Sequence, residues 1–471
     1  MLVMKFGGTS VECADSITRV ARIVRERLDL QPTVVVSALA GITDQLHSLG
    51  HLSQRGCLDE ACDVVNRIEQ RHVQVAEALL GSNGECVIRD LKLSFGEVRA
   101  LLAAVAAIHE LTPRTADRLL SFGERWSSSL VTEAFRARGI PAVHVDASDV
   151  LITDATHSHA IPKMDLISVR AESAIRPLVN TKQVPVMGGF IGATQDGIPT
   201  TLGRGGSDFT ASIIGASLNV ERIEIWTDVD GMMTSDPRIC PDAQNIDSIS
   251  FEEAAELAHF GAKVLHPKTL QPAVELGIPV YVLNSRHPEN CGTRVEVGVI
   301  SDESRVRSIA CKRGIILAEV TAKHGLDAKL TASIFAAVEE QKCLVDLAAM
   351  SRANLALLLT SEDSAAALAK SLYELATVKI TTGVSLVSVV GRNVGRDPVI
   401  SACALSALSG LPVKMIFHGA SDMNLSFVVD EKQADAAVRS MHRVMFSSQA
   451  SQTPLIASHV HSEDAAAVVG A

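Results

Sequence analysis

The chain opens with LVMKFGGTS at residues 2–10, a short apolar run followed by two glycines and two small polar residues. Apolar residues then recur at the three- and four-residue spacings of an amphipathic helix, at Ile17, Val20, Val24 and Leu28. The glycines allow the backbone to turn tightly between the two elements. The stretch therefore predicts a β-strand, a turn and a helix, which is the repeating unit of α/β folds.

The same alternation continues to about residue 295. Further short apolar runs are candidate strands, at 33–37, 141–145, 184–191, 222–227 and 279–283. A second helical pattern lies at Val64, Ile68, Val75 and Leu79. Strands that alternate with helices favour a mainly parallel sheet covered on both faces. Gln195-Asp196-Gly197 is typical of a hairpin turn, so we expect part of this sheet to be antiparallel.

An internal repeat lies in the last third of the chain. Residues 351–359 (SRANLALLL) match residues 421–429 (SDMNLSFVV), and each copy follows a candidate strand, at 343–347 and 413–417. Each copy also lies between two helical patterns, so a βαββαβ unit is predicted twice. The alternative is a chance similarity of two strands, against which the matching order of the flanking elements argues.

These patterns predict a division into three parts. Residues 1–295 form the α/β domain and residues 304–447 the paired βαββαβ units. The first unit covers about 315–382, and the second covers 385–447 together with a strand from 304–312. Residues 448–471, rich in Ser, Ala and His, are expected to be a loose tail.

Composition limits the classes of function. The net charge is −11 and no dense basic run occurs, so we expect no nucleic-acid partner. No run of about 18 uncharged apolar residues is present, so we expect no membrane span. Met1 leads directly into a predicted strand, and the nine cysteines form no CxxC pair. We therefore expect no signal peptide, no structural zinc and a cytoplasmic protein with reduced thiols.

Two glycine-rich turns carry the first indication of chemistry. The turn after Lys5 and the run LGRGGSD at 202–208 each precede a predicted helix, an arrangement that brings backbone N–H groups toward a phosphate. Arg204 could hold a carboxylate through two parallel hydrogen bonds, and Ser207 or Asp208 could cap the helix. An ordinary strand–turn–helix joint is the alternative for the first turn. A simple cap does not explain three glycines around an arginine.

Several polar residues and glycines lie at or near the carboxyl ends of predicted strands: Lys5, Ser37, Gly188, Gly189, Thr227 and Asp228. Ligands bind beyond the carboxyl ends of strands in open α/β sheets, so these residues predict one shared site. Turn formation alone is a sufficient explanation for Asp230 and Asp236. Lys263 could reach a nucleotide phosphate. Glu124 lies in a predicted helix, and its position there is typical of a glutamate exposed to solvent.

The collected motifs closely resemble those of the aspartokinases, within the amino acid kinase family. They are KFGGTS at 5–10, SALAGIT at 37–43, FGE at 122–124, GGFIG at 188–192, TTLGRGGSD at 200–208, IWTDVDG at 225–231, TSDPR at 234–238 and FGAKVLHPKTL at 260–270. The C-terminal repeat resembles the paired ACT domains of the same family. The resemblance implies a three-layer sandwich around a mainly parallel sheet, followed by two ferredoxin-like ACT units.

The resemblance also implies an activity, the transfer of a phosphoryl group from ATP to L-aspartate to give ADP and 4-phospho-L-aspartate. This is the first step toward lysine, threonine and methionine. The implied catalytic residues are Lys5 and Asp208. The implied aspartate-binding residues are Ser37, Thr43, Glu124, Arg204 and Ser207, and the implied ATP-binding residues are Gly7, Gly8, Thr227, Asp228, Arg238 and Lys263. Mg²⁺ is expected to be carried mainly by the nucleotide, without a dedicated protein site.

The resemblance also bears on regulation. Val345, Asp346 and Ser351 align with an effector pocket of the lysine type, but Arg352 replaces an expected acidic residue and His324 an expected methionine. A missing carboxylate weakens pairing with an amino-acid ammonium group, so the sequence leaves the existence and identity of an effector open. ACT units of this family usually pair across subunits, so we expect a homodimer or a dimer of dimers.

Three alternatives remain at this stage. A kinase for another amino acid, such as glutamate, is disfavoured by the FGE and GRGGSD motifs together with the repeat. A catalytically silent regulatory subunit would be expected to lose Lys5 or Arg204, and both are present. A nucleic-acid-binding regulator would need a helix-turn-helix or a basic stripe, and the sequence has neither.

Overall fold

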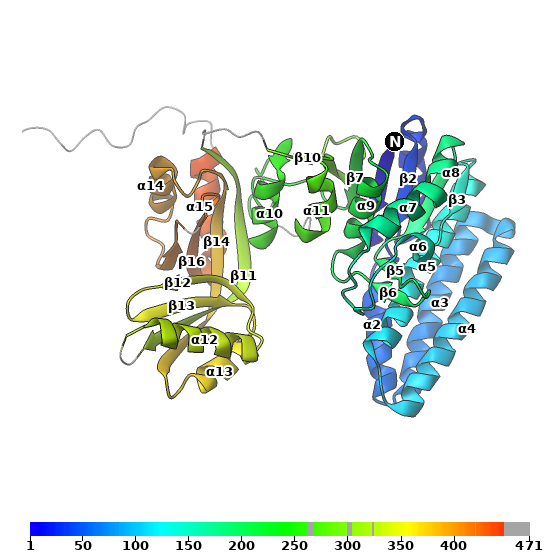
Figure 1. Ribbon diagram of the computed structural model, residues 1–471. Helices are drawn as coiled ribbons and strands as arrows, with labels where there is room; N and C mark the ends of the chain where they lie inside the picture. Colours follow the sequence, from blue (N-terminus) through cyan, green and yellow to red (C-terminus); the bar gives the residue numbers. More distant parts are fainter. Residues whose placement is uncertain (262–266, 299–303, 323–324, 420, 447–471) are drawn as a thin grey trace, which may run out of the picture. The chain divides into compact units, whose positions relative to one another are not determined.

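The computed structural model describes residues 1–261, 267–298, 304–322, 325–419 and 421–446 (Figure 1). The chain divides into two compact units. The first unit comprises Met1–Met233 and Gln244–Ser301, and the second comprises Thr234–Ala243 and Asp302–Ala471.

The first unit is built around an eight-stranded sheet with the order β3-β4-β2-β1-β7-β9-β10-β8. Its strands are β1 (Leu2–Phe6), β2 (Pro32–Val36), β3 (Ala142–His144), β4 (Val184–Gly188), β7 (Arg222–Thr227), β8 (Ser248–Ser250), β9 (Val280–Asn284) and β10 (Thr293–Glu296). Neighbouring strands are parallel, apart from the antiparallel pair β9 and β10. All five residues of β1, β2 and β4 are buried, as expected for a sheet covered on both faces.

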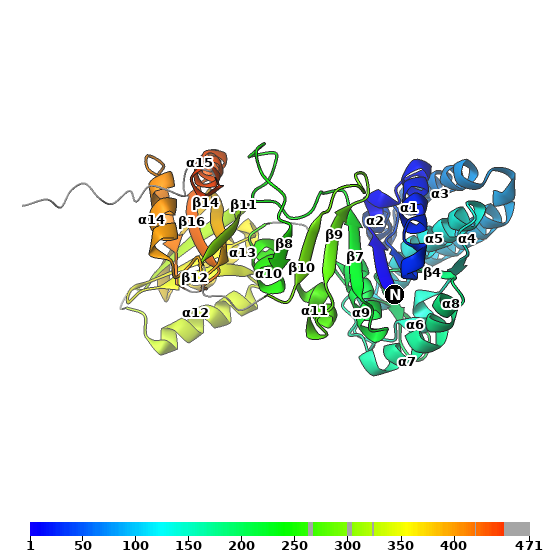
Figure 2. The same ribbon diagram turned by 90° about the horizontal axis from the view of Figure 1, so that it is seen from above.

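Helices cover both faces of this sheet, which gives three layers (Figure 2). One face carries α1 (Ala14–Arg25), α2 (Ile42–Gln54), α3 (Leu58–Leu80), α4 (Glu85–Ile108) and α5 (Pro113–Ala137). The opposite face carries α6 (Ala147–Val150), α7 (Met164–Ala174), α8 (Arg176–Asn180), α9 (Gly206–Ser217) and α11 (Pro267–Glu275). Helix α10 (Phe251–His259) follows β8, and short 3₁₀ turns occur at Gly8–Ser10, Leu28–Leu30 and Gly81–Gly84.

The predicted apolar faces account for the core of the first unit. Ile17, Val20 and Val24 on α1 are fully buried, while Leu28 lies beyond the helix in a 3₁₀ turn. On α3, Ile68 and Val75 are buried in the same cluster as Phe95 of α4 and Trp126 of α5. The three-layer α/β architecture expected from the sequence is confirmed.

The hairpin at Gln195–Gly197 is present but lies outside the main sheet. Strands β5 (Ile191–Ala193) and β6 (Pro199–Thr201) pair antiparallel as a separate two-stranded sheet. Phe190 adopts a left-handed φ of 64° directly after β4, and the chain leaves the main sheet there. The expectation that this hairpin belongs to the main sheet was therefore wrong. The antiparallel part of that sheet is formed by β10 and β8, which pair parallel with each other and run opposite to β9.

The second unit is a six-stranded antiparallel sheet with the order β12-β13-β11-β14-β16-β15. Its strands are β11 (Arg305–Ala322), β12 (Val345–Met350), β13 (Asn354–Leu359), β14 (Ala376–Arg392), β15 (Val413–Phe417) and β16 (Asn424–Asp430). Its helices are α12 (Ala328–Glu340), α13 (Glu362–Ser371), α14 (Pro398–Ala407) and α15 (Ala434–Phe446), with a 3₁₀ turn at Glu431–Gln433.

Two ferredoxin-like units share this sheet through its long central strands. The second half of β11 and the first half of β14 belong with β12, β13, α12 and α13, whose core includes Leu357 and Ile334. The other halves belong with β15, β16, α14 and α15, whose core includes Phe427 and Val438. The repeated βαββαβ pattern is confirmed. Residues 305–312, expected as a separate strand, form the first half of the continuous β11.

A short segment between β7 and β8 belongs to the second unit, although the chain on either side of it belongs to the first. Within Thr234–Ala243, Ser235 forms a parallel bridge with Ile309 of β11, and its hydroxyl donates to the Ile309 carbonyl at 3.0 Å. Cys240 is buried in the same core as Phe427. The assignment of this segment to the second unit was not predictable from the sequence, because it depends on contacts between distant parts of the chain.

Candidate active site

The strand ends that the sequence singled out meet at one edge of the first unit's sheet. Lys5 on β1 pairs in register with Val35 of β2 and Ile225 of β7. The turns after these strands are joined by backbone hydrogen bonds, since the Ser37 amide donates to the Phe6 carbonyl at 3.0 Å. The Gly189 amide donates to Val36 at 2.8 Å and the Gly7 amide to Trp226 at 3.1 Å. The turns thus form one continuous rim.

A buried ion pair lies at this rim. Lys5 Nζ is 2.5 Å from Asp208 Oδ1, and the two side chains are 11% and 15% exposed. Asp208 is in the first turn of α9, so the pair joins the central strand to a helix on one face of the sheet. The pair fixes a lysine ammonium group directly beside the glycine-rich turn that follows β1.

Helix α9 begins differently from the prediction. Ser207 or Asp208 was expected to cap it, but the N-cap residue is Gly205, at φ +72°, and no described side chain caps the helix. Asp208 is held by Lys5 instead. Gly189 packs so closely against Ser207 that an added Cβ would lie 2.7 Å from the Ser207 Cα. Because the first-turn amides lack a side-chain cap, they remain suited to binding an anion.

Glu124, the expected solvated glutamate, is buried on α5 and only 3% exposed, so that expectation was wrong. One carboxylate oxygen, Oε1, accepts from the Ala38 amide at 3.2 Å. The other, Oε2, has no hydrogen-bond partner among the described residues. Burial raises the pKa of Glu124 to about 8, against a partial opposing effect of the Ala38 amide. A buried carboxylate with a free oxygen is suited to receive a cationic group.

The other residues expected to bind a carboxylate or phosphate lie near these groups in the chain. Ser37 follows β2 and is half-buried, and Thr43 is half-buried in the first turn of α2. Arg204 is exposed in the turn between β6 and α9, four residues before Asp208. Ser207 is buried beside Gly189. These positions place hydroxyl and guanidinium groups on the segments that form the rim.

The residues expected to contact a nucleotide form the neighbouring part of the rim. The carbonyl of Thr227, at the end of β7, accepts from both the amide and the hydroxyl of Ser285, at 2.8 and 3.1 Å. The Ser285 hydroxyl also lies 2.8 Å from that of Ser10. Asp228 is exposed and accepts from the Thr227 hydroxyl at 3.2 Å. The turn at Gly7 and Gly8 is thereby joined to the ends of β7 and β9.

Comparisons with known proteins agree with this geometry. The model of the amino acid kinase family matches residues 1–284, and an ACT domain model matches residues 387–445. The lysine-sensitive aspartokinase 3 of Escherichia coli is 34% identical over 455 residues, covering 95% of this chain and 99% of its own length. The chloroplastic aspartokinase 1 of Arabidopsis thaliana is 32% identical, covering 95% of this chain and 80% of its own length.

The chain belongs to the aspartokinase family.

Solved structures of this family superpose closely on the chain. The crystal structure of E. coli aspartokinase III with aspartate and ADP, in the R-state, matches with a TM-score of 0.80 at 32% identity. It covers 95% of this chain and 100% of its own. The same enzyme with lysine and aspartate, in the T-state, matches with a TM-score of 0.81, covering 95% and 99%. The chain is accordingly a kinase with an amino acid kinase domain and ACT units.

Two residues expected at the nucleotide are not part of the described first unit. Arg238 lies in the Thr234–Ala243 segment of the second unit, where its 88% exposed side chain pairs with Asp236 at 2.6 Å. Lys263 lies outside the described residues.

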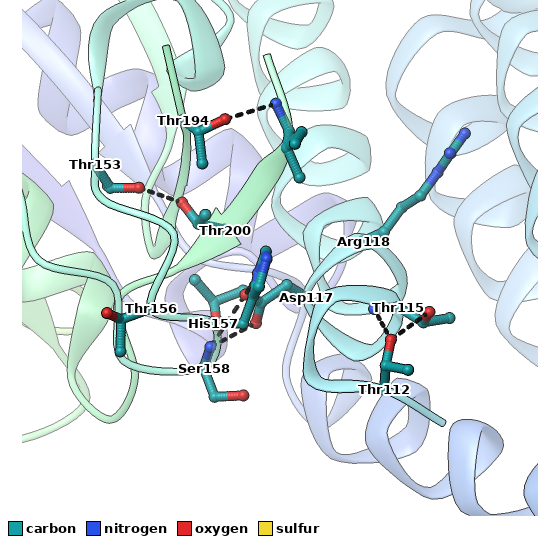
Figure 3. Close-up of polar contacts among 12 residues, drawn as sticks. Thr112, Thr115, Asp117, Arg118, Thr153, Thr156, His157, Ser158, Thr194 and Thr200 are labelled. Carbon is teal, nitrogen blue, oxygen red and sulfur yellow. Dashed lines mark hydrogen bonds and ion pairs between the residues drawn. The ribbon is translucent and has the colours of Figure 1, made fainter. Parts of the chain in front are cut away.

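Sequence reasoning missed a buried acid on the same helix as Glu124. Asp117 on α5 is fully buried and accepts from His157 Nδ1 at 2.7 Å and from the Thr201 hydroxyl at 2.6 Å. Its two oxygens also accept from the Ser158 amide at 3.1 and 3.0 Å (Figure 3). Asp117 thus joins α5 to the end of β6, directly before the GRGG turn. An aspartate five residues after a helix N-cap gives no sequence signal for this role.

The view in Figure 3 shows how the same region is tied together by hydroxyl groups. The Thr153 and Thr200 hydroxyls lie 2.8 Å apart, and the Thr194 hydroxyl accepts from the Ile198 amide at 3.2 Å. The β5–β6 hairpin and the segment before it therefore form one hydrogen-bonded platform beside the start of α9.

A second missed residue holds two turns of the rim. Arg71 on α3 donates to the carbonyl of Ala40 at 2.8 Å and to that of Glu12 at 3.0 Å. Ala40 belongs to the turn after β2, and Glu12 follows the glycine turn after β1. One guanidinium thus fixes both turns, a role that depends on tertiary contacts and not on a local motif.

The residues expected to bind an effector lie on the second unit. Val345 and Asp346 begin β12, and Asp346 pairs with Lys312 Nζ at 2.6 Å. The Ser351 hydroxyl accepts from the Asn354 amide at 3.1 Å in the following turn. Arg352 is exposed in that turn, and His324 lies outside the described residues. The carboxylate expected to meet an effector therefore already has a cationic partner.

Proposed function

We propose that this chain is an aspartate kinase, which transfers the γ-phosphoryl group of ATP to the side-chain carboxylate of L-aspartate. The products are ADP and 4-phospho-L-aspartate, the first intermediate on the route to lysine, threonine and methionine. The observation that carries the proposal is that two groups needed for this reaction lie on the same rim. An acid with a free oxygen, Glu124, lies on the same rim as the Lys5–Asp208 ion pair.

Aspartate carries one ammonium group, which needs an anionic partner, and two carboxylates, which need cationic or hydrogen-bonding partners. We assign the α-ammonium group to Glu124, whose free oxygen Oε2 is buried and unpaired among the described residues. Arg204 holds the α-carboxylate, since its planar fork matches a carboxylate. Ser37, Thr43 and Ser207 supply hydroxyl groups to aspartate or to the transferred phosphoryl group.

ATP binds beside the aspartate site. The backbone amides at Gly7 and Gly8 face the phosphates, and Thr227 and Asp228 hold the nucleoside at the end of β7. Arg238 and Lys263 remain proposed ATP ligands. Mg²⁺ accompanies the nucleotide and is held mainly by phosphate oxygens, where it supplies charge neutralisation.

The chemistry needs no general base. The attacking carboxylate is already ionised at neutral pH, so the protein's task is to align two anions and to neutralise the charge between them. Lys5 stabilises the negative charge that develops on the phosphoryl oxygens, and Asp208 holds the Lys5 ammonium group in place. The amides at the start of α9 add a positive field of their own.

The second unit is proposed to be a sensor that controls this activity through its ACT units. We propose a homodimer or a dimer of dimers in the cytoplasm. The nine cysteines, all of them in the described part of the chain, are free thiols, a state typical of a reducing compartment. Among the described helices, none combines the length and the apolar character needed to cross a bilayer.

A substrate comparison tests the proposed function. Purified full-length protein is assayed for ADP release with ATP, Mg²⁺ and either L-aspartate or L-glutamate, and the acyl phosphate is trapped with hydroxylamine. We expect aspartate-dependent ADP release with formation of aspartyl hydroxamate, and at least about 100-fold lower kcat/KM for glutamate, since one added methylene displaces the carboxylate. ADP release that requires glutamate, or that yields no hydroxamate, contradicts the proposal.

A further inference from the structure

A cluster of cysteine, aspartate and histidine side chains lies in the second unit. One ligand atom each from Cys240, Asp242 and His442 lies within 4.8 Å of the other two. Cys240 and Asp242 belong to the segment Thr234–Ala243, whereas His442 is on α15. All three are in the same compact unit, so their relative placement is part of one fold.

We propose that Cys240, Asp242 and His442 bind a divalent transition-metal ion such as Zn²⁺. A thiolate, an imidazole and a carboxylate are the three ligand types that Zn²⁺ takes in proteins. Mg²⁺ prefers oxygen ligands in octahedral geometry, so the thiol and imidazole select against the metal that accompanies ATP.

The imidazole of His442 is oriented as in known metal sites. Its Nε2 lies 2.9 Å from the Thr234 hydroxyl, while its Nδ1 faces Asp242 at 3.8 Å. With Nε2 bonded to Thr234, Nδ1 is the nitrogen directed at the cluster. Metal-binding histidines are usually held in this way, by a hydrogen bond from the second ring nitrogen.

Burial and spacing favour an ion with one open position. Cys240 and His442 are buried, whereas the Asp242 side chain is 78% exposed. The exposed side gives an ion access and leaves room for a water as fourth ligand. Ligand atoms around tetrahedral Zn²⁺ lie about 3.5 Å apart, given bond lengths of about 2.0–2.3 Å. The exposed Asp242 side chain is free of packing that would stop it from closing the remaining gap, and binding displaces the Cys240 thiol proton to solvent.

The consequence is a crosslink within the second unit. A bound ion would join the Thr234–Ala243 segment to α15, in addition to the contact of Ser235 with β11. The chain enters and leaves this segment from the first unit, and the segment contains Arg238, a proposed ATP ligand. The ion therefore fixes a part of the nucleotide-binding sequence on the regulatory sheet.

Cobalt substitution tests the site on the full-length, metal-free protein. We expect Co²⁺ to give visible tetrahedral d–d bands and a near-ultraviolet thiolate-to-cobalt band that saturate at one equivalent per chain. Zn²⁺ is expected to remove both. Cys240→Ser should lose the thiolate band, and Asp242→Asn should weaken Co²⁺ binding at least about tenfold, as removal of a ligand does.

Matched variants distinguish this site from adventitious binding. Cys403→Ser changes a partly exposed cysteine of the same unit and should keep the full cobalt spectrum. Asp242→Asn alters an exposed side chain, so it decides the question even if Cys240→Ser fails to fold. A spectrum without a thiolate band, or one that Cys240→Ser and Asp242→Asn leave unchanged, would overturn the proposal.

Discussion

Two acidic side chains on the rim, the buried Glu124 and the half-buried Asp208, differ in their partners, and this difference gives them different roles. Asp208 has a lysine ammonium group at 2.5 Å. Glu124 has one backbone amide at 3.2 Å and a second oxygen without a described partner. A buried carboxylate without a cation favours its protonated form, so Glu124 gains a charge partner only when a ligand brings one.

The first prediction concerns the pH dependence of aspartate use. The pKa of Glu124 is about 8 in the free protein, so most of the carboxyl is protonated at pH 7. A protonated carboxyl cannot pair with an ammonium group, and kcat/KM for aspartate should therefore rise with pH and level off above about 8. Glu124→Gln should lower kcat/KM by about 100-fold, the cost of removing one partner of a buried charge pair, and should abolish this rise.

Steady-state kinetics between pH 6 and pH 9 provide the measurement, with Glu133→Gln, a less buried glutamate on the same helix, as control. An unchanged pH profile in Glu124→Gln would show that another group controls aspartate binding.

At the scale of elements, the loops that form the rim are held by hydrogen bonds from side chains on the neighbouring helices α3 and α5. Asp117 ties α5 to the β6 end before the GRGG turn, and Arg71 ties α3 to two of the rim turns. Asp117 and Glu124 lie seven residues, or about two turns, apart on the same helix, so α5 both presents a ligand and supports the loop facing it.

The second prediction concerns Asp117. Asp117→Asn keeps the shape of the side chain but turns an NH₂ group toward the donors of His157, Ser158 or Thr201. Loosening of the loop should raise the KM for aspartate by about tenfold while the KM for ATP changes little, because misplaced loops cost binding of the ligand that they position. Asp149→Asn, an exposed change nearby, is the control. Equal effects on both KM values, or none on either, would contradict this positioning role.

The third prediction concerns the helices that cover the sheet. His72 on α3 is buried against the rings of Phe95 and Trp126, and its Nδ1 lies 2.8 Å from the Ile68 carbonyl. Burial lowers its pKa from 6.5 to about 4. Above pH 6.5 the His72 ring is neutral in both the folded and the unfolded protein. Below it, the unfolded state takes up a proton that the folded state does not, so the free energy of unfolding falls as the pH drops toward 4.

The loss should be on the order of 3 kcal/mol across that range. Urea unfolding of wild type and His72→Leu at several pH values measures it. Below pH 6.5 the free energy of unfolding should fall less steeply with decreasing pH in His72→Leu than in the wild type. The control His47→Gln, which changes an exposed histidine, should behave like the wild type. An equal pH dependence of the free energy of unfolding in the wild type and His72→Leu would contradict the role assigned to His72.

The comparison between sequence and structure is clearest at the scale of elements. Strand positions, the parallel sheet and the repeated ACT pattern were predictable, because each depends on local periodicity. The strand ends at Lys5, Ser37 and Thr227 converge as expected, since parallel strands end at one edge. The burial of Glu124, the network of Asp117 and the displaced β5–β6 hairpin were not predictable from residue spacing. They follow from which distant segments pack together.

At the scale of the whole molecule, the chain combines a catalytic and a regulatory unit, and the regulatory unit includes one segment from within the catalytic part of the sequence. Thr234–Ala243 belongs to the second unit by its contacts, although it lies between β7 and β8 of the first. The regulatory unit thereby includes part of the sequence proposed to serve ATP binding.

The fourth prediction concerns the effector. Asp346 is already paired with Lys312 at 2.6 Å, and Arg352 places a further cation in the turn after β12. An amino-acid ammonium group would have to displace Lys312, so lysine should inhibit weakly or not at all. Kinase assays with lysine, threonine, methionine or no effector, repeated with Lys312→Met, measure this. Strong lysine inhibition of the wild-type enzyme would contradict the expectation, whereas inhibition that emerges in Lys312→Met would support it.

The most direct test of the central claim is the turnover of Lys5→Ala. The account holds that the Lys5 ammonium group neutralises the phosphoryl oxygens while two anions react. Removing it should lower kcat for aspartate-dependent ADP formation at least about 100-fold, with a much smaller change in the KM for aspartate. Lys163→Ala, an exposed change in the same unit, should keep wild-type turnover. A folded Lys5→Ala protein with kcat within about threefold of wild type would contradict the account.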